Sequence, residues 1–221
     1  MKKIAVFDFD GTLFENESMP FIWSKYGELG FSRFRQTAAI IKIVRDKLIT
    51  DKLLSKKQKF KDLGTIHMHK MFNGMDNETV DKFFEDIAPE VMKGLNENVV
   101  EELKRLQKEN YTTLLISGCF EPLIKVIAKN LDIDYAFATK IPFRDGVVEV
   151  DNANVQLVNG TNKLEIIDSE FVEDDIDWDN SYAYSDSITD LDLLKRFGNP
   201  IAVNPDIQLM EYAQKNNITI I

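Results

Sequence analysis

From residue 94 to the C-terminus, short apolar stretches alternate with segments of helical periodicity. The apolar stretches favour β-strands at 111–117, 135–139, 181–185, 199–204 and 218–221, and another buried strand is predicted at 3–9. Apolar residues three to four positions apart predict helices at 96–110, 121–131, 162–171, 189–197 and 206–216. IPFRDGVVEV (141–150) is typical of a hairpin that turns at Asp145 and Gly146. This alternation predicts an α/β fold with a doubly wound, mainly parallel sheet.

One long stretch interrupts the alternation. Residues 17–86 show helical periodicity, for example in FSRFRQTAAIIKIVRDKLI, and contain no convincing strand. We expect a helical cap that is inserted after the first strand and covers the strand ends. The predicted organisation is a catalytic core of residues 1–16 and 94–221 with a helical cap domain of residues 17–93.

The composition indicates which classes of protein this chain can belong to. Hydrophobic residues make up 44% of the 221, so the chain can bury a full core. No apolar run reaches the roughly 18 residues of a membrane-spanning helix, and the N-terminal apolar stretch is broken by two aspartates, so neither a membrane partner nor a signal peptide is expected. The single cysteine, Cys119, permits no intrachain disulfide and suits the cytoplasm. The net charge of −10 argues against a nucleic-acid partner.

The charge is unevenly distributed along the chain. Residues 33–70 contain eleven Lys and Arg and three Asp, a net charge of +8, so the remaining residues carry −18. A basic segment in an acidic protein can recognise an anion, or it can be a solvated helix face. The sequence leaves open whether this segment lines a pocket.

The first predicted strand leads into two carboxylates, Asp8 and Asp10. Side chains alternate along a strand, so the two lie on one side, where they repel each other when both are ionised. A cation between them, or a proton on one of them, would relieve the repulsion. Three more polar points follow predicted strands or begin predicted helices, in ISGCF (116–120), GTNK (160–163) and YSDSITD (184–190). In an open α/β sheet such points meet at the carboxyl ends of the strands, where ligands bind.

These points supply four carboxylates, one hydroxyl and one ammonium: Asp8, Asp10, Asp186, Asp190, Ser117 and Lys163. Mg²⁺ prefers oxygen ligands and is often held by one or two carboxylates and a substrate phosphate. The hydroxyl, the ammonium and backbone amides around Gly11, Thr12 and Gly118 would hold phosphate oxygens. Asp8 could then attack phosphorus and form an aspartyl phosphate.

Four motifs carry a resemblance to a known family. DFDGTLF, ISG, the lysine after GTN, and YSDSITDLDLL resemble, in this order, the motifs of the haloacid dehalogenase-like superfamily of phosphatases. The helical insertion between the first two motifs is similar to that of subfamily IB, the phosphoserine-phosphatase-like hydrolases. The resemblance implies an Mg²⁺-dependent phosphomonoester hydrolase that acts through an aspartyl phosphate on a small phosphorylated metabolite.

The resemblance also implies roles for the matching acidic residues. Asp8 matches the nucleophile, and Asp10 matches the general acid/base, whose backbone carbonyl also binds the metal. Asp186 matches the acidic metal ligand. Asp190 matches the second acid of that motif, which orients the metal site.

The phosphate-binding motifs match less closely. Ser117 and Lys163 match the hydroxyl and the ammonium that hold the phosphate. Gly11 stands where phosphoserine phosphatases usually have serine, Cys119 where they commonly have glycine, and SDSITD where they usually have GDGAND.

Substrate selectivity is expected from the start of the cap. Glu17 lies nine positions after the nucleophile, where phosphoserine phosphatases place a glutamate that meets the substrate's amino group. Phe21 and Trp23 follow in the first turns of the cap and are expected near the pocket mouth. A carboxylate and aromatic faces both attract a cation, so these residues predict an amino-bearing substrate.

Two alternative functions remain open. A phosphotransferase would use the same intermediate with another hydroxyl in place of water, whereas a receiver-type signalling module would use its acid cluster, Ser/Thr and Lys as a phosphoacceptor. Receivers are shorter and have no helical insertion after the first strand. His67 and His69 lie two positions apart in a predicted helix and point in different directions, so they do not predict a zinc site.

Overall fold

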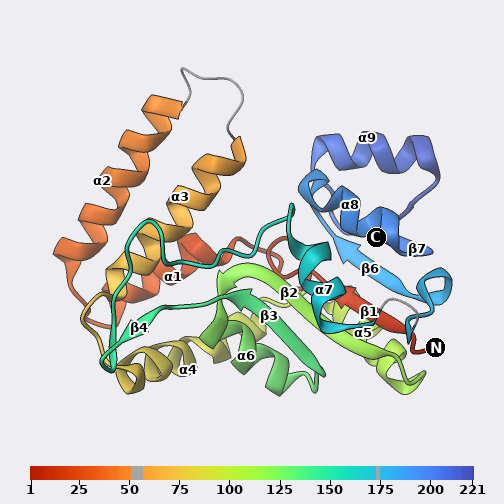
Figure 1. Cartoon of the computed structure of the whole chain (residues 1–221), viewed down its shortest axis with the longest axis horizontal. Coiled ribbons are helices and arrows are strands. Elements are labelled where there is room, and N and C mark those ends of the chain that lie inside the picture. Colours follow the sequence, from red (N-terminus) through yellow and green to blue (C-terminus); the bar gives the residue numbers. More distant parts are fainter. Residues whose placement is uncertain (51–56, 173–174) are drawn as a thin grey trace.

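The computed structural model describes residues 1–50, 57–172 and 175–221, and for 46–50 and 57–60 the backbone alone. A six-stranded sheet forms its centre, in the order β3-β2-β1-β6-β7-β8, and all neighbouring strands are parallel. Its strands are β1 (Ile4–Phe7), β2 (Thr112–Phe120), β3 (Tyr135–Thr139), β6 (Tyr182–Ser185), β7 (Asn199–Ala202) and β8 (Thr219–Ile220). The predicted doubly wound sheet is confirmed, with β1 beside the point where the strand order reverses (Figure 1).

Alternation along the strands divides the core into two layers. Ala5 and Phe7 of β1 belong to one hydrophobic cluster, whereas Ile4 and Val6 belong to the other. The first cluster includes residues of α5 (Glu97–Lys108) and α6 (Glu121–Asn130), and the second includes residues of α7 (Lys163–Glu170), α8 (Leu191–Arg196) and α9 (Ile207–Asn216). Helices therefore cover both faces, which explains why the central strands read as continuous apolar runs.

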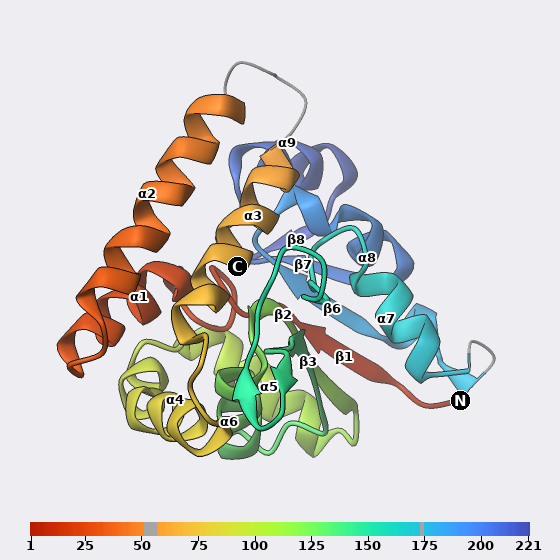
Figure 2. The ribbon, with the colours of Figure 1, turned by 60° about the vertical axis from the view of Figure 1, so that its left-hand side comes forward.

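The predicted helical insertion lies between β1 and α5. It comprises α1 (Ser18–Glu28), α2 (Arg33–Thr50), α3 (Lys57–His69), the 3-10 helix η1 (Lys70–Phe72) and α4 (Asn77–Lys93). The helices α2 and α3 pack side by side and extend away from the sheet (Figures 1 and 2). In the described part of the insertion, no segment contributes a strand to the sheet.

An aromatic cluster joins the insertion to the core. The ring centre of Phe72 lies 5.4 Å from that of Tyr26 in α1 and 5.4 Å from that of Phe120 at the end of β2. Phe84 of α4 packs on the same Phe120 ring at 5.2 Å, and α4 runs along α6. The last helix of the insertion thus lies against the core, and the boundary at residues 93 and 94 stays a prediction.

The remaining elements are short. The predicted hairpin is confirmed as antiparallel β4 (Phe143–Arg144) and β5 (Val147–Val148), with Asp145 and Gly146 at the positive φ values of a tight turn. Two further 3-10 helices are η3 (Trp178–Asn180) and η4 (Ile188–Asp190). In the residues that the structure describes, no helix is both long and apolar enough to cross a membrane.

Candidate active site

The carboxyl ends of β1, β2 and β6 face a cavity of about 470 Å³ between the core and the cap. Open α/β folds bind ligands at this edge of the sheet. Nine of the predicted site residues line the cavity: Asp8, Asp10, Glu17, Trp23, Ser117, Gly118, Lys163, Asp186 and Asp190. The fold therefore gathers residues from both ends of the chain into one site.

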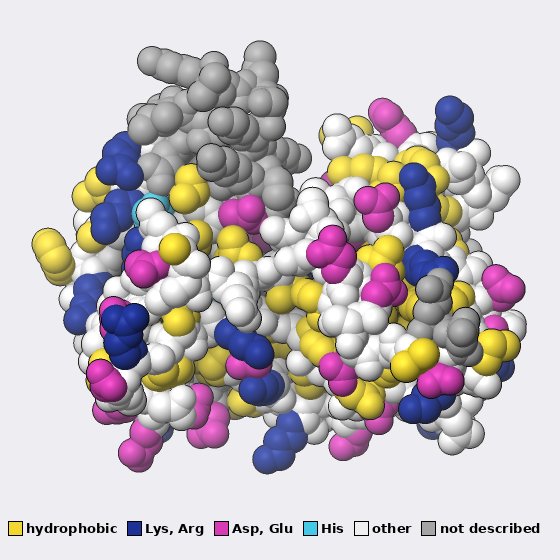
Figure 3. Space-filling model, viewed as in Figure 1, with side chains coloured by type: hydrophobic (Ala, Val, Ile, Leu, Met, Phe, Trp, Pro, Cys, Tyr) yellow, Lys and Arg dark blue, Asp and Glu magenta, His cyan; other side chains and the backbone are white. Residues whose placement is uncertain are grey.

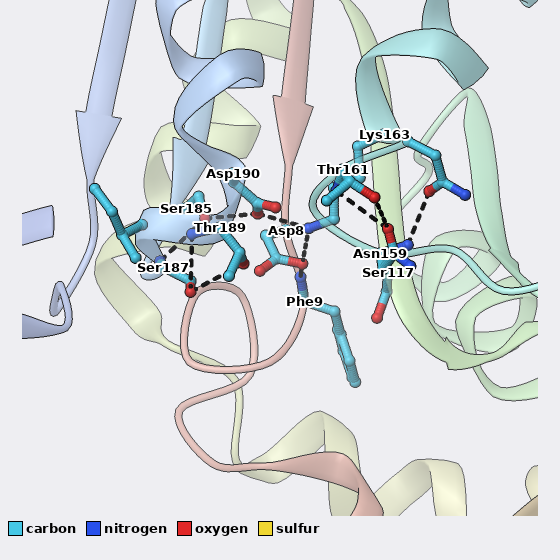
Figure 4. Close-up of polar contacts among 12 residues, drawn as sticks. Asp8, Phe9, Ser117, Asn159, Thr161, Lys163, Ser185, Ser187, Thr189 and Asp190 are labelled. Carbon is cyan, nitrogen blue, oxygen red and sulfur yellow. Dashed lines mark hydrogen bonds and ion pairs between the residues drawn. The ribbon is translucent and has the colours of Figure 1, made fainter. Parts of the chain in front are cut away.

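The ammonium group of Lys163 lies between two carboxylates (Figure 4). Its Nζ is 2.7 Å from Oδ1 of Asp8 and 2.7 Å from Oδ2 of Asp190, and all three side chains are almost completely buried. Ser185, at the end of β6, donates a further hydrogen bond of 2.7 Å to Asp190. Burial favours neutral lysine, but the two carboxylates outweigh it and raise the pKa of Lys163 above its usual value. Lys163 therefore remains charged.

Asp8 uses one of its two oxygens in these contacts. Oδ1 accepts the bond from Lys163 and another from the backbone N–H of Phe9 at 2.8 Å. The other oxygen points away from Lys163 (Figure 4). Burial raises the pKa of Asp8 to about 6, and the charge of Lys163 opposes this rise. Asp8 thus has a fixed orientation and one oxygen directed away from its cationic partner.

Asp10 is held at both carboxylate oxygens by Ser18, the first residue of α1. The Ser18 N–H donates to Oδ1 at 2.7 Å, and the Ser18 hydroxyl donates to Oδ2 at 3.0 Å. Burial raises the pKa of Asp10 to about 7, while these hydrogen bonds act in the opposite direction. Such a group can carry or release a proton near neutral pH. Sequence reasoning missed Ser18, whose only signal was its place at the start of a predicted helix.

Asp186 lies against the loop that follows Asp10. Gly11 in this loop has a φ of +71°, and a Cβ on it would lie 2.4 Å from Oδ2 of Asp186. Glycine is therefore required here by both the backbone conformation and the close carboxylate. Burial, followed by the charge of Asp8, raises the pKa of Asp186 to about 8.

Ser117 and Gly118 lie at an irregular end of β2. The strand continues three residues beyond its predicted end, and its register with β3 shifts between Ser117 and Phe120. The Ser117 hydroxyl oxygen accepts a hydrogen bond of 3.0 Å from the Cys119 N–H. This shift lets Ser117 line the cavity while Cys119 is fully buried. Burial raises the pKa of the Cys119 thiol.

A hydrogen-bonded loop before α7 positions Lys163. The Asn159 side-chain oxygen accepts bonds from the N–H and hydroxyl of Thr161, at 3.1 and 2.6 Å. Its amide group donates to Asp62 of α3 at 3.3 Å. The loop that presents Lys163 therefore also contacts the cap. Sequence reasoning missed Asn159, because NGTN indicates a turn without indicating its distant partner.

Two predicted phosphate-binding residues have a different place. Gly11 and Thr12 do not line the cavity, and their N–H groups donate to the carbonyl oxygens of Asn16 (3.4 Å) and Phe9 (3.2 Å). The Thr12 side chain is fully buried. In this structure their amides close the loop after Asp10, and their predicted contact with phosphate stays a prediction.

Phe21 also lies outside the cavity lining. Its ring packs edge-on against Phe14, with ring centres 6.2 Å apart. Residues two positions apart on a helix point in different directions, and Trp23 is the one that lines the cavity. Of the two predicted aromatics, the structure thus brings only Trp23 to the cavity lining.

The cap supplies an apolar wall with three charged groups. The wall includes Met19, Trp23, Ile40, Ile43 and Met68, and the charged residues are Glu17, Lys61 and Asp62. Of the basic stretch 33–70, Lys61 reaches the cavity lining, whereas Arg35 donates to the carbonyl oxygens of Met71 and Asn73. The side chains of residues 46–60 lie outside the described part of the chain.

The two histidines of α3 are buried away from these groups. The His69 ring stacks on Phe120 with ring centres 3.9 Å apart, and its Nδ1 lies 2.8 Å from the carbonyl oxygen of Thr65. Burial lowers the pKa of His69 to about 4, so the ring is neutral. His69 is therefore a packing residue of the cap.

Asp8, Asp10 and Asp186, which the sequence predicts as metal ligands, line the same cavity and could hold a divalent cation there. Across the described residues, no three His, Cys, Asp or Glu side chains converge closely enough to hold a metal by themselves. Two carboxylates completed by a carbonyl, water and substrate phosphate form the shell that Mg²⁺ accepts. Asp8, Asp10, Asp186 and Asp190 line the cavity together with Lys163, which pairs with Asp8 and Asp190, so the excess of carboxylates favours an added cation and the donor set fits Mg²⁺.

Comparison with known proteins identifies the family of this chain. The family model of haloacid dehalogenase-like hydrolases matches residues 5–195. The curated phosphoserine phosphatase of Methanocaldococcus jannaschii is 27% identical over 203 residues, which cover 91% of this chain and 85% of that protein.

Solved structures share the fold. A protein of unknown function from Bordetella pertussis Tohama I has a TM-score of 0.78 at 20% identity, over 100% of this chain and 98% of that chain. A phosphoserine phosphatase solved as a phospho-aspartyl intermediate analogue has a TM-score of 0.63 at 23% identity, over 99% and 92% of the two chains. The chain therefore belongs to the haloacid dehalogenase-like hydrolase family, and the relatives named above that it resembles include phosphoserine phosphatases.

Proposed function

We propose that this phosphatase is an Mg²⁺-dependent phosphomonoester hydrolase that forms an aspartyl phosphate on Asp8. One observation carries the proposal: Asp8, Asp10, Ser117, Lys163 and Asp186 line one cavity at the carboxyl edge of the sheet. The similarity to a phosphatase solved as a phospho-aspartyl intermediate analogue supports the same chemistry.

In the first step, an Asp8 oxygen attacks phosphorus and the bond to the ester oxygen breaks. Lys163 and the Ser117 hydroxyl bind phosphate oxygens, and Asp190 keeps the ammonium in place. Protonated Asp10 gives its proton to the leaving oxygen. Bound at Asp8 and Asp186, Mg²⁺ would supply positive charge to the transferring phosphoryl group.

In the second step, Asp10 acts in the opposite sense. The ionised carboxylate takes a proton from water, the water oxygen attacks phosphorus, and the bond to Asp8 breaks to release phosphate. A pKa near 7 suits a group that must be protonated in one step and ionised in the next.

The cap wall would select the substrate. Glu17 and Asp62 attract a cationic group, and Trp23 adds an aromatic face whose indole N–H donates to the Gln36 carbonyl oxygen at 3.4 Å. Lys61 offers a charge for an anionic group. We infer a small, amino-bearing phosphomonoester, and phosphoserine, for which the Methanocaldococcus jannaschii relative is named, is the first compound to assay.

Rapid quenching with a phosphate-labelled substrate tests the intermediate. We expect acid-stable, hydroxylamine-sensitive label on the wild-type chain and no label or turnover with Asp8→Asn. With an activated aryl phosphate, whose leaving group needs no proton, we expect accumulated label with Asp10→Asn, because only the second step then depends on Asp10. Asp145→Asn, in the exposed hairpin turn, is the control and should behave like wild type. Turnover by Asp8→Asn in a clean preparation would refute the mechanism, and a phosphorylated alcohol formed from an added acceptor would identify the phosphotransferase alternative.

A further inference from the structure

The outer face of α2 exposes large apolar side chains to solvent. Phe34, Ile41 and Val44 are 83%, 62% and 50% exposed. They lie seven and three positions apart and therefore form one stripe along the helix. The opposite side of the helix carries buried Ala39 and the pocket residue Ile43. An exposed apolar stripe of this kind marks an interaction surface.

Basic side chains flank this stripe. Residues 33–45 of α2 include Arg33, Lys42 and Arg45 and no acidic residue, and a fourth basic residue, Arg35, donates to carbonyl oxygens of the cap. Figure 3 shows hydrophobic and basic side chains together along the edge of the molecule formed by α2. Residues 33–70 carry +8 and the rest of the chain −18, so the positive charge is concentrated in one stretch of the sequence, of which residues 33–45 of α2 are part.

We propose that this face of α2 docks on an anionic lipid surface, with the helix lying along it. An amphipathic helix with apolar side chains and flanking Lys and Arg binds in this way without crossing the membrane. The sequence-based expectation of no membrane partner rests on the lack of a spanning segment, which does not exclude surface binding.

The charge distribution favours lipid over a second copy of the chain. Two copies joined through α2 would bring their basic residues together, whereas anionic headgroups attract them. The acidic remainder of the chain is repelled by the same headgroups, which would turn the cap toward the bilayer.

Docking in this orientation would place the pocket beside the bilayer. Ile40 is 37% exposed and also lines the cavity, so it lies between the outer stripe and the active site. The single helix α2 would then separate the cavity from the lipid surface.

Vesicle co-sedimentation of the full chain, with no substrate present, tests the proposal. The probes are vesicles of neutral phosphatidylcholine and vesicles of equal parts phosphatidylcholine and phosphatidylglycerol. We expect the wild-type chain to pellet with the mixed vesicles, to stay largely in solution with the neutral ones, and to be released by added salt. Phe34→Ser/Ile41→Ser should lower the bound-to-free ratio about ten-fold or more, and so should Arg33→Glu/Lys42→Glu.

A matched control separates this face from general surface hydrophobicity. Ile207, at the start of α9 beside Asp206, is 78% exposed, and Ile207→Ser should bind vesicles like wild type. Neither Phe34 nor Ile41 lines the cavity, so hydrolysis of a soluble aryl phosphate should be unchanged and verifies folding of the double variant.

Three results would overturn the proposal. They are a wild-type chain that stays in solution with anionic vesicles, a Phe34→Ser/Ile41→Ser variant that binds as well as wild type, and an Ile207→Ser variant that loses binding equally. A wild-type dimer that dissociates in the Phe34→Ser/Ile41→Ser variant, without vesicle binding, would assign the face to a second copy instead. Binding is measured without turnover, so failure here is distinct from failure of the proposed hydrolase activity.

Discussion

Replacing Ser18 with alanine removes one of the two hydrogen bonds that hold the proposed acid/base. In the wild-type chain, the N–H of Ser18 lies 2.7 Å from Oδ1 of Asp10, and its hydroxyl lies 3.0 Å from Oδ2. Ser18→Ala keeps the N–H contact and loses the hydroxyl contact. Asp10 would then be fixed at one oxygen and free to rotate away from the leaving group.

The expected loss follows from the strength of the missing bond. A hydrogen bond to a charged group contributes about 1.5–3 kcal/mol, and each ~1.4 kcal/mol is a factor of ten in rate. Because the backbone bond remains, we expect the lower end of this range, a decrease of about ten- to thirty-fold in kcat. KM should change little, since Ser18 holds the acid/base and does not touch the phosphate.

Steady-state kinetics with alkyl and activated aryl phosphates would measure this effect. The alkyl ester needs a proton on its leaving oxygen, so in Ser18→Ala the rate of phosphoryl transfer should decrease more for the alkyl ester than for the aryl ester. Ser24→Ala is the matched control, because the Ser24 hydroxyl donates to Glu28 at 2.9 Å on the exposed side of the same helix. Ser18→Thr, which keeps a hydroxyl, should recover most of the activity.

Some outcomes would refute this role of Ser18. If the kcat of Ser18→Ala on the alkyl ester lies within two-fold of the wild-type value, the Ser18 hydroxyl does not orient Asp10. An equal loss in Ser24→Ala, or a change in KM alone, would point to a general effect on α1. Thermal unfolding of each variant separates these results from misfolding.

Three further changes have expected outcomes. Lys163→Met leaves Asp8 and Asp190 buried without their cation and should lower the free energy of unfolding by about 3–5 kcal/mol in denaturant titrations; a loss under about 1 kcal/mol would contradict the buried ion pairs. Glu17→Gln should raise KM for an amine substrate about ten-fold and leave KM for an aryl phosphate unchanged. An equal change in KM for both substrates would contradict the proposed preference for a cationic substrate. In EDTA, the pKa of Asp186 is about 8 in the folded chain, against an ordinary value of 3.8. Between these pH values the folded chain binds a proton that the unfolded chain has released, so the free energy of unfolding should fall as pH rises. Mg²⁺ should restore the thermal midpoint most at pH above about 8, and a midpoint unaffected by both pH and Mg²⁺ would exclude the cation site.

Local patterns in the sequence determined the core of this protein. Each buried strand is a short apolar run, so β1, β3 and β6 could be located without knowing their neighbours. Parallel strands end at one edge of the sheet, and this rule alone placed Asp8, Ser117 and Asp186 together before any contact was known. The motif spacing then implied the family.

The tertiary structure decided which side chains face the site. Whether Phe21 or Trp23 lines the cavity depends on the rotation of α1 about its axis, which is set by packing against Phe14 and Gln36. The two bonds from Ser18 to Asp10 likewise depend on where α1 begins relative to the loop after β1. Periodicity identifies a helix and its buried face, but it does not contain the rotation or the position of that helix relative to another segment.

Long-range polar contacts could not be predicted from the sequence either. Asn159 and Asp62 are 97 positions apart, and neither lies in a pattern that indicates the other. Turn residues such as those around Asn159 satisfy their hydrogen bonds locally in many arrangements. Which arrangement forms depends on how the cap and core pack together, because that packing determines which distant donors and acceptors are within reach.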